Sequence, residues 1–358
     1  MALGLIIASS VSHPILVHFS MTVLGVGRGL PMISKIVIIR KYFNKDNFNK
    51  ANGFASAGGS LGLFLLPPLI EGLNHMYGWR GGLLIFGALC LNSGFAGFLM
   101  KEGNKDKENI DPVENLEDEE QHSEVNEKRC SVSCKNIWEM FGFATLKRHP
   151  SFVIELITFT LLDLALYGWF FFLFTFLTSN GVSYKIASIV SAIGGAGSLF
   201  GRLVFGPLLD KILSARRLIA ISALIASVTL TMYPFDFFEI SYWWWGGLTF
   251  LTGIFAGTTT PIYTALIEEK FPDNKSDFAS AVGLHYMMRG VGILCGGPLT
   301  GFIYDKTGNF DLAFFVLAGF QATGGALVCL ELFLKREHCL YDLEKTSTAS
   351  ESEIERLK

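Results

Sequence analysis

The chain has 358 residues, of which 50% are hydrophobic and 17% charged, and its mean hydropathy is +0.41. Soluble globular proteins carry about 25% charged residues, so this composition argues against a large soluble protein. The net charge of −3 argues against a nucleic-acid partner, because nucleic-acid-binding proteins show a clustered basic excess.

Nine apolar segments are long enough to cross a bilayer as helices. A hydrocarbon core of about 30 Å requires roughly 20 residues at 1.5 Å per residue. Ahead of them, Met1–Ala8 is apolar but too short to span, and it resembles the second half of a helix whose beginning is missing. The predicted spans are Ile15–Ile39, Ala51–Leu73, Trp79–Met100, Phe152–Thr178, Ile186–Leu209, Leu218–Pro234, Tyr242–Ile267, Phe278–Tyr304 and Leu312–Leu334.

Basic residues in the short loops predict the orientation. Lysines and arginines gather in the loops at 40–50, 211–217 and 270–275, whereas the alternating loops hold few. Because basic loops stay in the cytoplasm, we expect these three loops there, together with Lys101–Arg148 and the tail 335–358.

The segment Lys101–Arg148 is acidic and poor in apolar residues, so we expect a disordered cytoplasmic linker. It separates an N-terminal bundle, 1–100, from a C-terminal six-helix bundle, 149–334. Within it, Cys130 and Cys134 have a spacing that suits a zinc knuckle poorly. We therefore expect no metal and no cofactor.

Motifs in four places resemble one known family. The loop after the first full span opens with Tyr42-Phe43 and runs through lysines into Ala51-x-Gly-x-Ala-x-Ala-Gly58. The turn Tyr77-Gly-Trp-Arg-Gly-Gly82 follows. Later come Gly201-Arg-Leu-Val-Phe-Gly-Pro-Leu-Leu-Asp-Lys211 and Gly296-Gly-Pro-Leu-Thr-Gly-Phe-Ile-Tyr-Asp305. Their order and spacing resemble the monocarboxylate transporter family of the major facilitator superfamily.

The resemblance implies an all-α polytopic membrane protein with a major-facilitator fold. It places half of helix 3 and helices 4–6 in 1–100, and helices 7–12 in 149–334, so about the first two and a half of twelve helices have no counterpart. The missing part includes an Asp-Gly-Gly-type signature and a lysine that lactate carriers use. A further departure is Asp46-Asn47, which stands where the family has paired arginines.

The resemblance also implies a function. We expect a secondary carrier that moves a small organic carboxylate across the plasma membrane by alternating access, and not an enzyme. The lipid bilayer and, as in some members of the family, a single-span ancillary membrane protein are the implied partners.

Five ionisable residues stand out within the predicted spans, where each costs roughly 2.5–3.5 kcal/mol at mid-helix. Four cations against one carboxylate favour an anionic substrate. The resemblance places the arginine that meets the substrate carboxylate at Arg202, and puts Arg28, Lys35 and Asp163 on cavity-lining helices. The alternative is that Arg28 and Lys35 reach the membrane surface or pair internally, and that Arg289 pairs with Asp163 or a helix end. The five candidate substrate-binding residues are Arg28, Lys35, Asp163, Arg202 and Arg289.

Two positions narrow the substrate. Lactate carriers of the family have an aspartate where this chain has Ser198, and a bulky aromatic residue where it has Ala256. The resemblance therefore implies a wider pocket without the arginine–aspartate proton switch. We expect a larger or zwitterionic carboxylate as substrate, and not a dedicated proton–lactate carrier. His285 is interpreted as a packed histidine rather than a proton carrier.

Glycines at four-residue spacing predict close helix contacts, as in Gly197-x3-Gly201 and Gly292-x3-Gly296. They favour either a sliding surface between the two bundles or simple helix packing.

A second functional hypothesis is a truncated, non-transporting isoform that regulates or partners the full-length carrier, because a cavity without its first helices cannot close. A channel or membrane enzyme is disfavoured, since no filter sequence or catalytic motif is visible in the spans.

Overall fold

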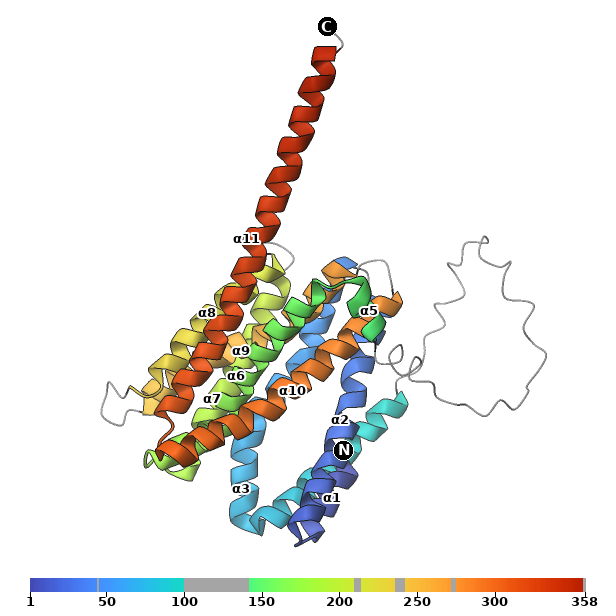
Figure 1. Cartoon of the computed structure of the whole chain (residues 1–358). Coiled ribbons are helices and arrows are strands. Elements are labelled where there is room, and N and C mark those ends of the chain that lie inside the picture. The colour runs from blue at the N-terminus through green and yellow to red at the C-terminus, as the bar shows by residue number, and fades with distance from the viewer. Residues whose placement is uncertain (44, 100–141, 209–213, 236–241, 272–274, 357–358) are drawn as a thin grey trace, which may run out of the picture. The chain divides into compact units, whose positions relative to one another are not determined.

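The computed structural model describes residues 1–43, 45–99, 142–208, 214–235, 242–271 and 275–356. All regular secondary structure in these ranges is helical (Figure 1). The helices are α1 (Ala2–Ser10), α2 (Pro14–Tyr42), α3 (Lys45–Leu99), α5 (Phe143–Arg148), α6 (Phe152–Ser179), α7 (Tyr184–Leu208), α8 (Ala215–Met232), α9 (Tyr242–Lys270), α10 (Lys275–Thr307) and α11 (Asp311–Arg356).

Within the described residues, eight helices are long and apolar enough to cross a membrane. One of them, Lys50–Asn92, contains 43 residues and covers the predicted span Ala51–Leu73 and the first part of Trp79–Met100. The break between these spans lies at Gly78, whose φ of 68° is non-helical. A left-handed conformation favours glycine, so the Tyr77-Gly-Trp motif interrupts α3 where the sequence predicts a turn.

The chain divides into two compact units. Unit 1 comprises Met1–Leu30 and Met76–Met140, and unit 2 comprises Pro31–His75 and Phe141–Lys358. Helices α2 and α3 each contribute residues to both units.

In unit 1, α1 packs closely against the first part of α2. A Cβ added to Gly4 would lie 2.6 Å from the carbonyl oxygen of Ser20, so only glycine allows this approach. Arg80 Nη2 donates a hydrogen bond to Ser12 Oγ at 3.0 Å.

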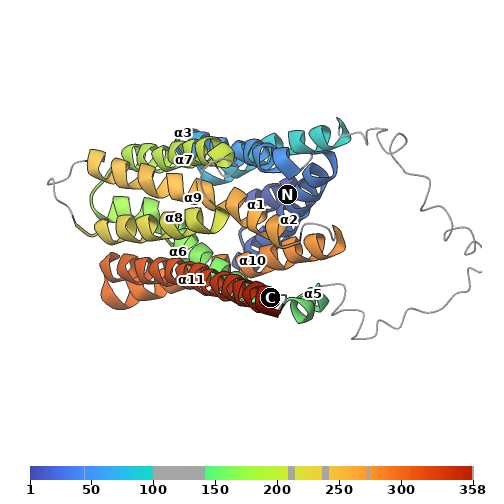
Figure 2. The same cartoon turned by 90° about the horizontal axis from the view of Figure 1, so that it is seen from above.

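Unit 2 is a helical bundle in which α7 packs on α9, α6 packs on α10 and α11, and α8 packs on α9 and α11 (Figure 2). Its interior contains large aromatic clusters. The rings of Tyr233 and Phe314 stack with their centroids 5.1 Å apart, and Phe176 meets both rings edge-on. The Tyr233 hydroxyl forms a hydrogen bond with Thr249 at 3.0 Å, which satisfies a polar group that would otherwise be unpaired in the core.

Glycines bring the backbones of α7 and α9 together. A Cβ on Gly201 would fall on the carbonyl oxygen of Ile254, and a Cβ on Gly257 would fall on the carbonyl oxygen of Ser198. Gly197 likewise faces the backbone of α9. These glycines therefore serve packing between two helices of the C-terminal bundle, which supports the simple-packing interpretation of Gly197-x3-Gly201.

The same holds for α6 and α10. A Cβ on Gly292 would lie 2.7 Å from the carbonyl oxygen of Thr160, and one on Gly296 would fall on that of Leu164. Both contacts again join helices of the C-terminal bundle.

The predicted linker lies largely outside the described residues, as do Cys130 and Cys134. The last residues of the predicted linker segment, Phe143–Arg148, form the short helix α5. Thr145 and Arg148 bind the carboxylate of Asp277 at 3.3 and 3.1 Å, and these contacts hold the short helix at the start of α10. The backbone of α11 continues as a helix through the expected tail to Arg356.

Candidate functional site

Two of the predicted cations converge on Ser56, a buried residue of α3 within unit 2. Lys35 Nζ, from the second part of α2, donates to Ser56 Oγ at 3.0 Å. Arg202 Nη1, from α7, donates to the Ser56 carbonyl oxygen. Both cationic side chains are half-buried, so they remain accessible to a solute.

The face of α7 that carries Arg202 packs against α3. Gly195, Ser198 and Arg202 share one helical face at intervals of three and four residues. Gly195 lies against the α3 backbone, and Ser198 Oγ forms a hydrogen bond with Ser60 Oγ at 2.8 Å. Ser198 therefore has a neutral partner, and α7 supplies no carboxylate beside its arginine.

Asp163 and Arg289 form a second pair, between α6 and α10. Asp163 is fully buried, and its Oδ1 lies 3.7 Å from Arg289 Nε, beyond hydrogen-bond distance. Arg289 Nη2 donates to the Tyr167 hydroxyl at 2.9 Å. In the described part of the chain, both Asp163 oxygens and Arg289 Nη1 lack a hydrogen-bond partner. The pairing matches the alternative interpretation of Arg289, because a buried charge requires an opposite charge nearby.

The two cations at Ser56 and the arginine of the Asp163–Arg289 pair lie close enough to repel one another. Lys35 interacts electrostatically with Arg202 and Arg289, and Arg202 also interacts with Arg289. The structure thus brings together four of the five candidates: Lys35, Asp163, Arg202 and Arg289. Three cations face one carboxylate, so this region of unit 2 is positive and favours an anion.

The remaining candidates have other surroundings. Arg28 belongs to unit 1, where its side chain is exposed and has no hydrogen bond or ion pair among the described residues. Ala256 is half-buried on α9, next to the glycine that packs on Ser198. His285 is buried, and its ring meets Phe159 edge-on at 5.1 Å, which agrees with a packed histidine.

Sequence reasoning missed two contributors, Ser56 and Tyr167. Tyr167 follows Asp163 by four residues, so helical spacing alone places both on one face of α6. Ser56 occupies a variable position of the Ala-x-Gly-x-Ala-x-Ala-Gly motif, and its use of a backbone carbonyl left no signal in the sequence.

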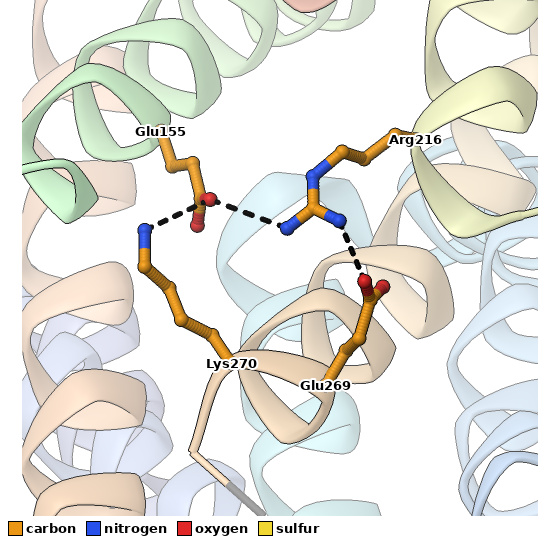
Figure 3. Close-up of polar contacts among 4 residues, drawn as sticks. All are labelled: Glu155, Arg216, Glu269 and Lys270. Carbon is orange, nitrogen blue, oxygen red and sulfur yellow. Dashed lines mark hydrogen bonds and ion pairs between the residues drawn. The ribbon is translucent and has the colours of Figure 1, made fainter. Parts of the chain in front are cut away.

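A further ionic network, which the sequence did not predict, joins the start of α6, the start of α8 and the end of α9 (Figure 3). Glu155 Oε1 accepts a hydrogen bond from Lys270 Nζ at 3.0 Å and lies 3.6 Å from Arg216 Nη2. Arg216 Nη1 also donates to Glu269 Oε1 at 2.6 Å. Glu155 and Arg216 are almost wholly buried, so this network ties three helices together.

Comparison with known proteins assigns the chain to a family. The family model described as Major Facilitator Superfamily matches residues 1–282 and 178–338. The chain belongs to the major facilitator superfamily. The predicted all-α major-facilitator fold is thereby confirmed, and so is the prediction that the chain crosses the membrane several times.

Among sequence relatives, this superfamily member is 26% identical over 334 residues to monocarboxylate transporter 12 of Mus musculus, covering 87% of the chain and 65% of the relative. It is 26% identical to monocarboxylate transporter 13 of Bos taurus, covering 93% and 71%, and 28% identical to monocarboxylate transporter 6 of Mus musculus, covering 91% and 69%. The resemblance read from the motifs is confirmed. The chain spans about two thirds of the length of these curated relatives.

Among solved structures, a point variant of the E. coli fucose:proton symporter matches with a TM-score of 0.61 and 16% identity, covering 92% of this chain and 80% of that one. At this identity the similarity concerns the fold alone.

Proposed function

We propose that this protein is a secondary carrier that moves a small organic carboxylate across the plasma membrane by alternating access. The observation that carries the proposal is Arg202, a half-buried cation on a membrane-spanning helix that is held at Ser56 and forms no ion pair among the described residues. One Nη1 hydrogen bond fixes the guanidinium, while its buried Nε has no partner in the described part of the chain. A planar guanidinium binds carboxylates through two parallel hydrogen bonds, and a charge kept inside a membrane is usually functional.

The substrate preference follows from the neighbours of Arg202. Ser198 provides no carboxylate that could exchange a proton with Arg202, so the carrier is not a dedicated proton–lactate carrier. Ala256, a small side chain where lactate carriers of the family have a bulky aromatic residue, favours a carboxylate larger than lactate. Lys35, Asp163 and Arg289 are further substrate-binding groups in the proposal.

Several finer assignments rest on the resemblance and on charge patterns. Arg28 is proposed as a substrate contact because it is a cation within a membrane-spanning helix. The central linker and the C-terminus are proposed to be cytoplasmic, because they lie on the side of the basic loops. A single-span ancillary membrane protein is the proposed partner, as in the monocarboxylate transporter family.

Uptake of radiolabelled carboxylates into cells expressing the chain tests the proposal. Arg202→Lys keeps the charge but removes the planar fork, so we expect uptake to fall about tenfold or more at equal surface expression. The matched control is Arg217→Lys, because Arg217 is exposed at the start of α8 and belongs to neither pair. Equal uptake by wild type and Arg202→Lys would overturn the assignment.

A further inference from the structure

Lys35 and Arg202 form a doubly positive centre that the described residues leave uncompensated. Both side chains end at Ser56, which offers only neutral atoms. Neither cation forms an ion pair within the described ranges. The nearest polar pair on the same face of α7, Ser198 with Ser60, is also neutral.

Asp163, a buried carboxylate of this region, already pairs with a different cation, Arg289. Asp163 is fully buried and faces Arg289, which lies at 3.7 Å on α10. Among the described residues of this region, one negative charge is therefore balanced by one positive charge, and Lys35 and Arg202 remain as an excess of two. Their mutual repulsion, and that of Arg289, increases as water leaves the site.

We propose that the preferred substrate is a short dicarboxylate, whose two carboxylates neutralise Lys35 and Arg202 at Ser56. This inference rests on the proposed carrier function and specifies its substrate class. A monocarboxylate would leave one cation unpaired, which is unfavourable in a membrane interior. A zwitterion would bring a third cation into a centre that already repels cations.

The geometry also limits the length of the substrate. Because both cations contact the same serine, the two carboxylates must lie close together, as they do in succinate. Arg202 is half-buried and makes a single hydrogen bond among the described residues, and Lys35 retains two ammonium protons beyond its bond to Ser56.

Binding of succinate and butyrate to the purified full chain in lipid nanodiscs tests this inference. The two acids have the same carbon chain and differ by one carboxylate. We expect wild type to bind succinate at least about tenfold more tightly than butyrate, because the second carboxylate meets the second cation.

Lys35→Met then separates a substrate contact from a structural role. This variant is expected to lose about tenfold in succinate affinity while butyrate affinity stays within about twofold. Lys185→Met is the matched control, since Lys185 is exposed at the start of α7 and should leave both affinities unchanged.

The outcomes distinguish this inference from the proposed function. Equal affinity for the two acids in wild type, or an equal loss for both in Lys35→Met, overturns the dicarboxylate assignment while carboxylate binding at Arg202 stands. Tighter binding of inorganic phosphate than of succinate overturns it as well, because a single dianionic group would then fill the centre. Failure of both acids to bind, together with no effect of Arg202→Lys on uptake, contradicts the proposed function itself.

Discussion

The network in Figure 3 allows a stability prediction that compares two glutamates, which differ in burial and in the number of cations they contact. Glu155 and Glu269 both bind Arg216, but the Glu155 side chain is 6% exposed and the Glu269 side chain is 53% exposed. The perturbation is Glu155→Gln, with Glu269→Gln as its control. Each change removes one negative charge and retains the size of the side chain.

The expected magnitudes follow from this difference. Removing one partner of a buried ion pair costs about 3–5 kcal/mol, because the other charge stays buried without compensation. In Glu155→Gln, Lys270 loses its carboxylate, whereas Arg216 keeps Glu269, so we expect a loss near the lower limit, about 3 kcal/mol. Glu269→Gln affects a half-exposed pair and should cost about 0–1 kcal/mol.

The free energy of unfolding can be measured by titrating SDS into protein in mixed micelles, with tryptophan fluorescence as the signal. Adding Lys270→Met to Glu155→Gln should recover part of the loss, because the double variant no longer buries an unpaired ammonium. If Glu269→Gln destabilises as much as Glu155→Gln, or if neither does, the greater burial and the second cation of Glu155 do not strengthen its ion pairs.

Two further predictions use the same unfolding measurement. Gly257→Ala should destabilise the protein by about 1–3 kcal/mol, because its Cβ would fall on the Ser198 carbonyl oxygen. The control Gly247→Ala meets open space, so its free energy of unfolding should be unchanged or slightly higher. Equal effects of the two changes would contradict the close approach of α7 and α9. Tyr167→Phe should cost about 1.5–3 kcal/mol, because Arg289 Nη2 loses its hydroxyl acceptor, and an unchanged free energy would show that this hydrogen bond makes no net contribution.

The helices were predictable because membrane spans require long apolar segments, and Gly78 was predictable as a break because it lies in a turn motif. Helix α5 was not, since six residues do not form a stable helix alone. Its stability depends on contacts with Asp277, which is distant in sequence.

The candidate site was predictable where charge was the signal. Arg202, Asp163 and Arg289 are conspicuous because ionisable groups are rare in membrane helices. The pairing of the last two and the role of Ser56 depend on how helices approach one another. The network around Glu155 was missed because its charges lie near the ends of spans, where they resemble ordinary loop charges.

Protection of Arg202 from phenylglyoxal tests its role in carboxylate binding most directly, because it needs no complete transport cycle. The purified chain in lipid would be treated with the reagent, with and without succinate or butyrate, and adducts at Arg202 and Arg217 quantified by mass spectrometry. If Arg202 binds the carboxylate, the acids slow its modification and leave that of the exposed Arg217 unchanged. Modification of Arg202 at the same rate with and without both acids would contradict carboxylate binding at this residue.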